Sequence, residues 1–420
     1  MGFMDKLGVV IPRAFFTLKD FLVLLIWLAL LYLLLLGVYR LYLTPSAKFP
    51  GPKLAALTFW YEFYYDVWQE GQYTWKIRDL HRKYALTVDI ISRVCFGASY
   101  DCLENKDFAR EWHAGMVSSS RMSHMLRQFP WIHEVLNRFP KIGPAVAREG
   151  ASADRERQMK LKQNIADVVD RRNRGEKPSD GAFTIFDSML DADVPASEKS
   201  FSRLISEAQT LTGAGAMTTA NALDTTFYHL LANPNCLNRL RGELVSSIPD
   251  PVAIPSVAQL ETLPYLTAVI HEGLRLSKGV PHRFARVSPD VPYQYDGITI
   301  PHGVPVGMSF VDFLENPDIF PDPDTFDPER WIPFDAPHVR QRRKSLVAFG
   351  GGTRMCLGIN LAWAELYLTV AVVARRLGDR MKLHEVVFER DVKVTVDGFN
   401  ALTSRESKGL RVTIGAKTEV

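Results

Sequence analysis

A single cysteine in a glycine-rich loop constrains this chain more than any other feature. Residues 349–358 read FGGGTRMCLG, and an apolar stretch typical of a helix follows over residues 360–376. Glycines let backbone amides approach the sulfur of Cys356, and amide donors together with the start of the next helix stabilise a thiolate. Arg354 supplies a cation that suits a carboxylate, such as a haem propionate. The pattern predicts an anionic sulfur that binds a metal, and thiolate is one of the haem-iron ligands.

The same loop is open to two alternative interpretations. A cysteine among apolar residues often serves only as a small hydrophobic side chain. A glycine-rich turn before a helix can also bind a nucleotide, but a G-x-G-x-x-G motif from Gly350 would need glycine where Met355 stands. The spacing therefore excludes the nucleotide motif and leaves the structural cysteine as the alternative.

The loop resembles the haem-binding signature of the cytochrome P450 family, F-x-x-G-x-R-x-C-x-G. The fixed positions are matched by Phe349, Gly352, Arg354, Cys356 and Gly358. Three further family motifs precede the loop in the family order. An isolated E-x-x-R pair says little, because such pairs are common on helices, but four motifs in order are specific. The resemblance runs from about residue 85 to residue 420.

The three preceding motifs carry their own expectations. Glu272 and Arg275 match the E-x-x-R pair, and Arg330 lies in FDPERW, the segment whose arginine completes a buried Glu–Arg–Arg triad in the family. A buried network of this kind is tolerable only when every charge is paired, and its expected role is to fix the fold near the haem loop. A solvated ion pair is the alternative.

Residues 214–219, AGAMTT, match the oxygen-activation segment except at Met217. The resemblance implies that Thr218 is the catalytic hydroxyl, placed at a distortion of the long central helix. A threonine that donates to its own i−4 carbonyl is the alternative. Many family members carry an acid where Met217 stands, so proton relay here is expected to use water, Thr219 or a substrate group. Gly213, Ala214 and Gly215 form a small-residue patch against which haem and O₂ are expected to lie.

The resemblance implies a mainly α fold with small β-sheets (α+β), the cytochrome P450 fold. It implies haem b with Cys356 as the axial iron ligand, O₂, and electrons from NADPH through a separate NADPH–cytochrome P450 reductase. The expected activity is hydroxylation or oxidation of an apolar small molecule. The sequence of residues 271–283 resembles that of family members from fungal secondary metabolism. A terpenoid or polyketide intermediate is the expected substrate, and a basic run at residues 338–344 is a candidate docking face for the reductase.

The family also implies a substrate pocket beside residues 211–218, 280–282 and 398–400. Val280 and Phe399 are apolar residues in polar, turn-like surroundings and are expected to line it. Core packing explains both residues equally well.

Part of the family pattern is absent from the sequence. Tyr84 should lead into a β-hairpin and a helix with a W-x-x-x-R haem contact, but Ala85 begins a segment that resembles a later helix. Early elements are therefore expected to be missing between Tyr84 and Ala85, through a loss of coding sequence or a degenerate gene. Two rival functions follow: a non-oxygenating rearrangement enzyme of the same fold, and an inert truncated membrane protein.

The front of the chain predicts a membrane anchor. Residues 21–38 contain no charge, and a helix of this length spans about 27 Å, close to the thickness of the endoplasmic-reticulum bilayer. A cleaved signal peptide is the alternative, although its apolar region is normally shorter. The expected organisation is a lumenal segment (1–20), a transmembrane anchor (21–39), a proline-rich hinge (40–53) and a cytosolic haem-thiolate domain (54–420).

Composition excludes several other classes. The net charge of +3 and the absence of a long basic block argue against a nucleic-acid partner. Four cysteines in 420 residues do not make a disulfide framework. Helices are predicted over residues 85–97, 151–174, 197–231 and 264–276, and strands over residues 284–287, 293–300 and 408–414, with Asp296-Gly297 as a hairpin turn.

Overall fold

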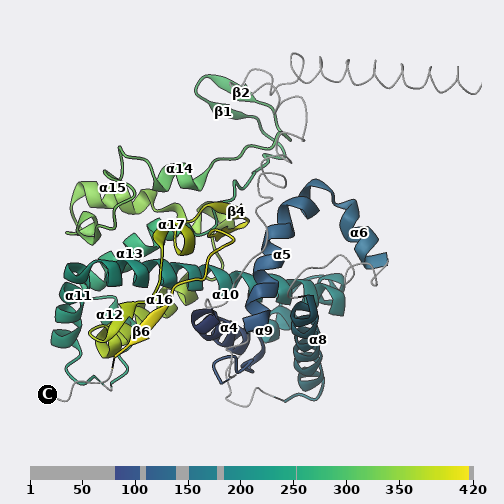
Figure 1. Ribbon diagram of the computed structural model, residues 1–420. Helices are drawn as coiled ribbons and strands as arrows, with labels where there is room; N and C mark the ends of the chain where they lie inside the picture. Colours follow the sequence, from purple (N-terminus) through teal and green to yellow (C-terminus); the bar gives the residue numbers. More distant parts are fainter. Residues whose placement is uncertain (1–80, 105–109, 139–150, 177–183, 252, 416–420) are drawn as a thin grey trace, which may run out of the picture. The chain divides into compact units, whose positions relative to one another are not determined.

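The structure of the protein is a computed structural model. It describes residues 81–104, 110–138, 151–176, 184–251 and 253–415 (Figure 1). The predicted anchor, its flanking segment and the proline-rich hinge lie outside these residues. Among the described helices, none combines the length and the apolar character that crossing a membrane requires.

Helices make up most of the described chain, which confirms the mainly α fold with small β-sheets. The α-helices are α4 His81–Phe96, α5 Arg110–Gln128, α6 Trp131–Arg138, α8 Ala151–Asn173, α9 Ile185–Asp191, α10 Phe201–Ala232, α11 Pro234–Ser247, α12 Val257–Leu260, α13 Pro264–Ser277, α14 Phe310–Leu314, α15 Pro337–Ser345, α16 Ile359–Leu377 and α17 Phe388–Asp391. Short 3₁₀ turns occur at Ala196–Lys199 (η4), Pro328–Trp331 (η5), Val347–Phe349 (η6) and Gly352–Arg354 (η7).

Within the described residues, six short strands form three separate two-stranded antiparallel sheets. Strand β3 Met381–Leu383 pairs with β6 Val412–Ile414, and β4 Val396–Gly398 pairs with β5 Asn400–Leu402. The predicted hairpin forms from β1 Tyr293–Tyr295 and β2 Ile298–Ile300, and residues 287–305, which contain it, belong to a different compact unit from residues 81–286 and 306–415. The strand expected at residues 284–287 is wrong, because Arg286 makes only an isolated bridge to Val306.

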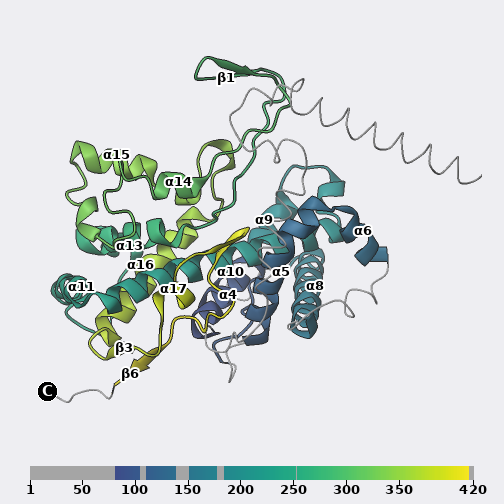
Figure 2. The same cartoon turned by 45° about the horizontal axis from the view of Figure 1, so that its top comes forward.

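Helix α10 is the element around which residues 81–286 and 306–415 are organised (Figures 1 and 2). Its first half buries Leu204, Ala208 and Ala216 in an apolar cluster with α4, α5 and α8. Its second half buries Leu223 and Leu230 in a larger cluster with α11, α13 and α16. Helix α10 therefore contributes side chains to both cores, and it is long enough to extend from one to the other.

Two close approaches fix the neighbours of α10. Adding a Cβ at Gly215 would place it 2.7 Å from the Ile91 side chain of α4, and the Thr87 hydroxyl donates to the Ala216 carbonyl at 2.9 Å. On α13, a Cβ at Gly273 would collide with the Thr226 hydroxyl of α10. Glycine is therefore required at both crossings, because a larger residue would push the helices apart.

We predict that Gly273→Ala lowers the free energy of unfolding by about 1–3 kcal/mol, because overpacking at a rigid helix crossing forces the backbones to shift. Chemical denaturation measures the change. Gly242→Ala on α11 is the matched control: a Cβ there meets nothing within 4 Å, so the better helix propensity of alanine should stabilise the protein by up to about 1 kcal/mol. Equal effects of the two substitutions would contradict the crossing.

Candidate active site

The E-x-x-R pair and Arg330 come together around one buried carboxylate. Glu272 is fully buried on α13, and its Oε1 accepts from Arg275 Nη2 at 2.8 Å and from Arg330 Nε at 3.0 Å. The same oxygen accepts the Asp327 amide, and Oε2 accepts Arg275 Nε and Trp331 Nε1, both at 2.9 Å. One carboxylate thus receives five hydrogen bonds, so the solvated alternative does not hold.

The remaining donors of the two arginines are also paired. Arg275 Nη1 donates to the carbonyls of Leu314 and Pro323, and Arg330 Nη1 donates to that of Pro321. Leu314 is the last residue of α14, and the two prolines belong to the segment between α14 and η5, which the network therefore fixes against α13. Sequence reasoning missed Trp331, although the tryptophan directly follows Arg330 in the matched motif.

A chain of rings joins this network to the cysteine loop. The ring of His271 lies 5.1 Å from that of Trp331 and 5.1 Å from that of Trp363, and the Trp363 ring lies 5.7 Å from that of Phe349. Burial lowers the pKa of His271 to about 4, so its imidazole is neutral and packs as an aromatic ring. The buried network thereby supports the first residue of the loop.

The loop itself is closed by its backbone. The Cys356 amide donates to the Phe349 carbonyl at 2.9 Å, and Gly350 and Gly352 take φ values of 68° and 71°, which favour glycine. Gly358 precedes α16 and accepts the Ala362 amide, which starts that helix. The spacing predicted a glycine-rich loop that leads into a helix, whereas the bond from the Cys356 amide to the Phe349 carbonyl was not anticipated.

The four cysteines differ in accessibility. Cys95 and Cys102 are buried, and burial raises the pKa of each thiol to about 12, whereas Cys356 is exposed. Leu357 beside it is 83% exposed, and a Cβ at Gly351, Gly352 or Gly358 would meet nothing within 4 Å. An accessible thiol beside exposed apolar surface and open glycines fits a flat apolar macrocycle. The alternative of a buried structural cysteine is wrong.

The expected oxygen-activation segment lies on α10, which is continuous from Phe201 to Ala232. The distortion expected at Thr218 is absent, and the Thr218 hydroxyl donates to the Ala214 carbonyl at 2.8 Å, as the alternative predicted. A hydroxyl satisfied within its own helix gives no reason for the helix to open. Of the small-residue patch, Ala214 is exposed and Gly213 faces open space, whereas Gly215 is covered by Ile91.

A buried acid near this segment was not anticipated. Glu365 on α16 is 5% exposed, and its Oε1 has no hydrogen-bond partner. Burial raises the pKa of Glu365 to about 7, against the lowering effect of a hydrogen bond with Thr219, the neighbour of Thr218. Met217 is itself buried and accepts a weak hydrogen bond from Asn400. The carboxyl nine residues after Cys356 is the sequence signal that could have been used.

The two expected pocket residues differ in surroundings. Val280 is half-buried after α13, and Phe399 is 42% exposed between β4 and β5 with a φ of 70°. The Phe399 ring lies 5.9 Å from that of His282 and 5.6 Å from that of Phe284.

The basic run on α15 contains one arginine with a structural role. Arg342 donates to the carbonyls of Ile319 and Arg330 and so stabilises the fold. His338, Arg340, Arg343 and Lys344 are exposed.

The comparison with known protein families gives one match. Residues 69–378 match the family described as cytochrome P450.

Several fungal relatives are similar along nearly their whole length. A tryptophan 6-hydroxylase from Fusarium equiseti is 32% identical, covering 91% of this chain and 94% of the relative. An N-acetyltryptophan 6-hydroxylase from Emericella nidulans is 32% identical (93% and 96%), and a cytochrome P450 monooxygenase from Sordaria araneosa is 33% identical (92% and 96%). The Fusarium alignment spans 493 positions, whereas 91% of the 420 residues is about 382, so about 111 positions are filled by the relative alone.

We predict that Arg275→Ala lowers the free energy of unfolding by about 3–5 kcal/mol, because it removes the main partner of a buried carboxylate. Arg203→Ala is the control: its ion pair with Glu207 is about half exposed on the arginine side, and such pairs contribute about 0–1 kcal/mol. Urea denaturation compares the two, and a small loss in both would show that Glu272 tolerates the change.

Glu365→Gln should alter how stability depends on pH. Below pH 4.5 the carboxyl is protonated in both folded and unfolded chains; between 4.5 and about 7 only the folded chain keeps the proton. The wild type therefore loses stability as pH rises through this window, whereas the glutamine side chain of the variant cannot titrate. The advantage of Glu365→Gln should grow by roughly 3 kcal/mol between pH 4.5 and pH 8. Denaturation at both pH values tests this, and parallel stability curves would contradict it.

Proposed function

The chain belongs to the cytochrome P450 family, and from this premise we propose that it oxidises a small molecule at a haem held by Cys356. It is a monooxygenase of fungal secondary-metabolism type, and its family uses haem iron, O₂ and electrons from a redox partner. The observation that carries the proposed site is the exposed Cys356 thiol in a loop with open glycines.

The residues of the loop have separate roles in this proposal. Cys356 would bind the haem iron through its thiolate, and a bound haem would supply the activation of O₂. Arg354 would bind a propionate, and Phe349 would support the loop through Trp363. Gly352 and Gly358 would leave room for the macrocycle, since a side chain there would occupy that space.

Proton delivery would depend on Thr218 and Glu365. The Thr218 hydroxyl can donate toward the substrate side only when it leaves the Ala214 carbonyl, a rotation that the half-buried side chain permits. Met217 cannot carry a proton. Glu365, whose pKa is near neutrality, would hold one beside Thr219. A buried acid of this kind can replace the missing acidic neighbour of Thr218.

The substrate and the setting complete the proposal. We take a terpenoid or polyketide intermediate as the substrate, and an indole amino-acid derivative also fits, since two relatives are named as tryptophan-type 6-hydroxylases. Val280 and Phe399 would line the pocket. The uncharged residues 21–38 support a single-pass anchor in the endoplasmic reticulum with a cytosolic catalytic domain and NADPH–cytochrome P450 reductase as the electron donor.

A specific observation favours a second candidate function. The Fusarium relative carries about 111 aligned positions that this chain does not fill, and we place the gap at the junction of Tyr84 and Ala85. A chain without the distal elements would bind haem weakly and be inert. Sequencing the transcript across this junction tests the placement.

We predict that Cys356→Ser abolishes the thiolate band in the reduced carbon-monoxide difference spectrum, because a neutral hydroxyl is a poor ligand for iron. Haem content after reconstitution is measured on the same sample. Cys236→Ser, at a half-buried cysteine of α11, is the matched control and should keep the band. A thiolate band in Cys356→Ser would remove this residue from the site, and none in the wild type would support the inert chain.

A further inference from the structure

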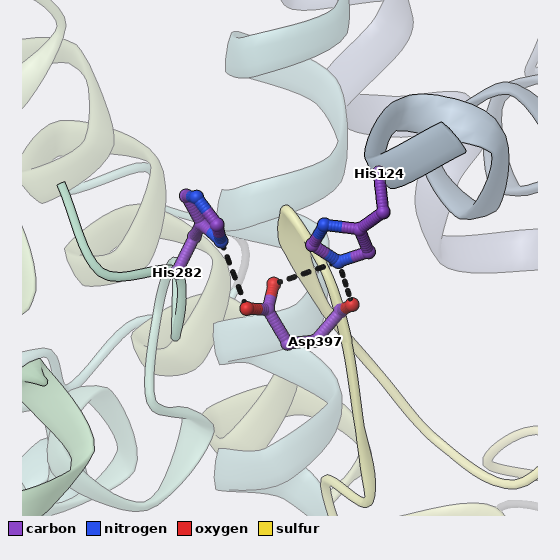
Figure 3. Close-up of side chains that lie close together, drawn as sticks. All are labelled: His124, His282 and Asp397. Atoms are coloured by element: carbon purple, nitrogen blue, oxygen red, sulfur yellow. Dashed lines mark hydrogen bonds and ion pairs between the residues drawn. The ribbon is translucent and has the colours of Figure 1, made fainter. Parts of the chain in front are cut away.

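Three side chains from distant parts of the chain converge on one point (Figure 3). His124 comes from the last turns of α5, His282 from the segment after α13, and Asp397 from β4. The Nδ1 of His282 lies 2.9 Å from Asp397 Oδ2, and the Nε2 of His124 lies 3.5 Å from Oδ1. Both histidine side chains are buried, at 3% and 9% exposure, and the aspartate is 35% exposed.

The donor set matches that of a transition-metal site. Two imidazoles and one carboxylate are ligands that Zn²⁺ binds at about 2.0–2.2 Å. The ligand atoms of the three residues lie within 4.8 Å of one another, so small rotations of the side chains would bring them around one ion. Such a group is not found elsewhere in the described residues.

The surroundings hold these ligands in place. From the same face of α5, the Ser120 hydroxyl donates to the Gly398 carbonyl at 2.6 Å and accepts from Asn400 Nδ2 at 3.0 Å. The Phe399 amide donates to Asp397 Oδ1 at 2.9 Å. The carboxylate and the helix are thus already oriented toward each other, and such outer contacts raise metal affinity by fixing the ligands.

The Nε2 of His124 contacts the Asp397 backbone carbonyl and would have to leave it to bind a metal ion. Arg127 is a second competitor of the ion at this point. Its guanidinium contacts the Nε2 of His282, and because arginine can only donate, the proton of this imidazole lies on Nδ1, toward Asp397. A metal ion on Nδ1 would require that proton to move to Nε2 and the Arg127 side chain, which is on an exposed residue, to turn away.

We propose that His124, His282 and Asp397 form a divalent transition-metal site, best suited to Zn²⁺, which fastens α5 to the β4–β5 hairpin. When no ion is bound, the positive charge of the Arg127 guanidinium lies beside the ligands in place of the ion. The site is separate from the haem ligand and does not depend on the proposed monooxygenase activity.

Zinc titration of the full chain by calorimetry tests the site. We expect one equivalent to bind, His282→Ala and Asp397→Asn to weaken binding more than roughly 100-fold, and Arg127→Ala to tighten it roughly tenfold by removing a like charge and freeing Nε2. His338→Ala, at an exposed histidine of α15, is the control and should leave the affinity unchanged. Absence of saturable binding, or binding that His282→Ala leaves intact, would overturn the proposal.

X-ray absorption at the zinc edge, on the wild-type chain and on Cys356→Ser, makes the test independent of how the cluster variants fold. Two imidazoles with oxygen ligands in both samples support the site. Sulfur coordination in the wild type together with loss of binding in Cys356→Ser would assign the zinc to the cysteine loop and overturn it.

Discussion

The buried carboxylate of Glu272 is the interaction on which the rest of this structure depends. Removing one carboxylate and two guanidinium groups from water is costly, and the cost is offset only when every donor and acceptor is paired. Here the five donors to Glu272 come from α13 itself, from η5 and from the backbone before it. The irregular segment after α14 buries Phe320 and Phe326 in apolar clusters, and the bonds to the carbonyls of Pro321 and Pro323 fix the backbone between them.

That path positions the cysteine loop. Trp331, held by Glu272, packs on His271, and the ring series continues through Trp363 to Phe349 at the start of the loop. Trp363 lies on α16, the helix that directly follows the loop. Damage to the charge network should therefore reach the loop through aromatic packing, without any contact between Arg275 and Cys356. This separates the role of the triad, which orients the loop, from that of the cysteine, which would bind the iron.

How much of this could be predicted depended on how local each signal is. The glycine-rich loop, the Glu272–Arg275 pair, the end of α10 and the bounds of α13 follow from local spacing to within one residue, and the matched motif added Arg330. The start of α10 does not, because residues 196–199 form a separate 3₁₀ turn and the helix begins at Phe201. The contacts of Trp331 and Gly273 and the cluster of His124, His282 and Asp397 join residues far apart in the chain, and no local pattern encodes them. Thr218 shows another limit: the family resemblance proposes it as the catalytic hydroxyl, but the hydrogen bond that it makes depends on whether its helix opens.

The loss of sequence expected between Tyr84 and Ala85 affects the binding of haem more than the folding of the chain. At the predicted junction, α4 runs from His81 to Phe96 without interruption, so Tyr84 and Ala85 are successive residues of one helix. The buried face of α4 packs against α10 through Ile91 and Thr87, and both apolar clusters along α10 are continuous. The scaffold that carries Cys356 and the Glu272 network is therefore closed by residues this chain possesses. We propose that the unmatched positions of the relatives add surface over the exposed Ala214 and the open side of the loop, where a haem would lie, so that their loss weakens haem binding more than it weakens the fold.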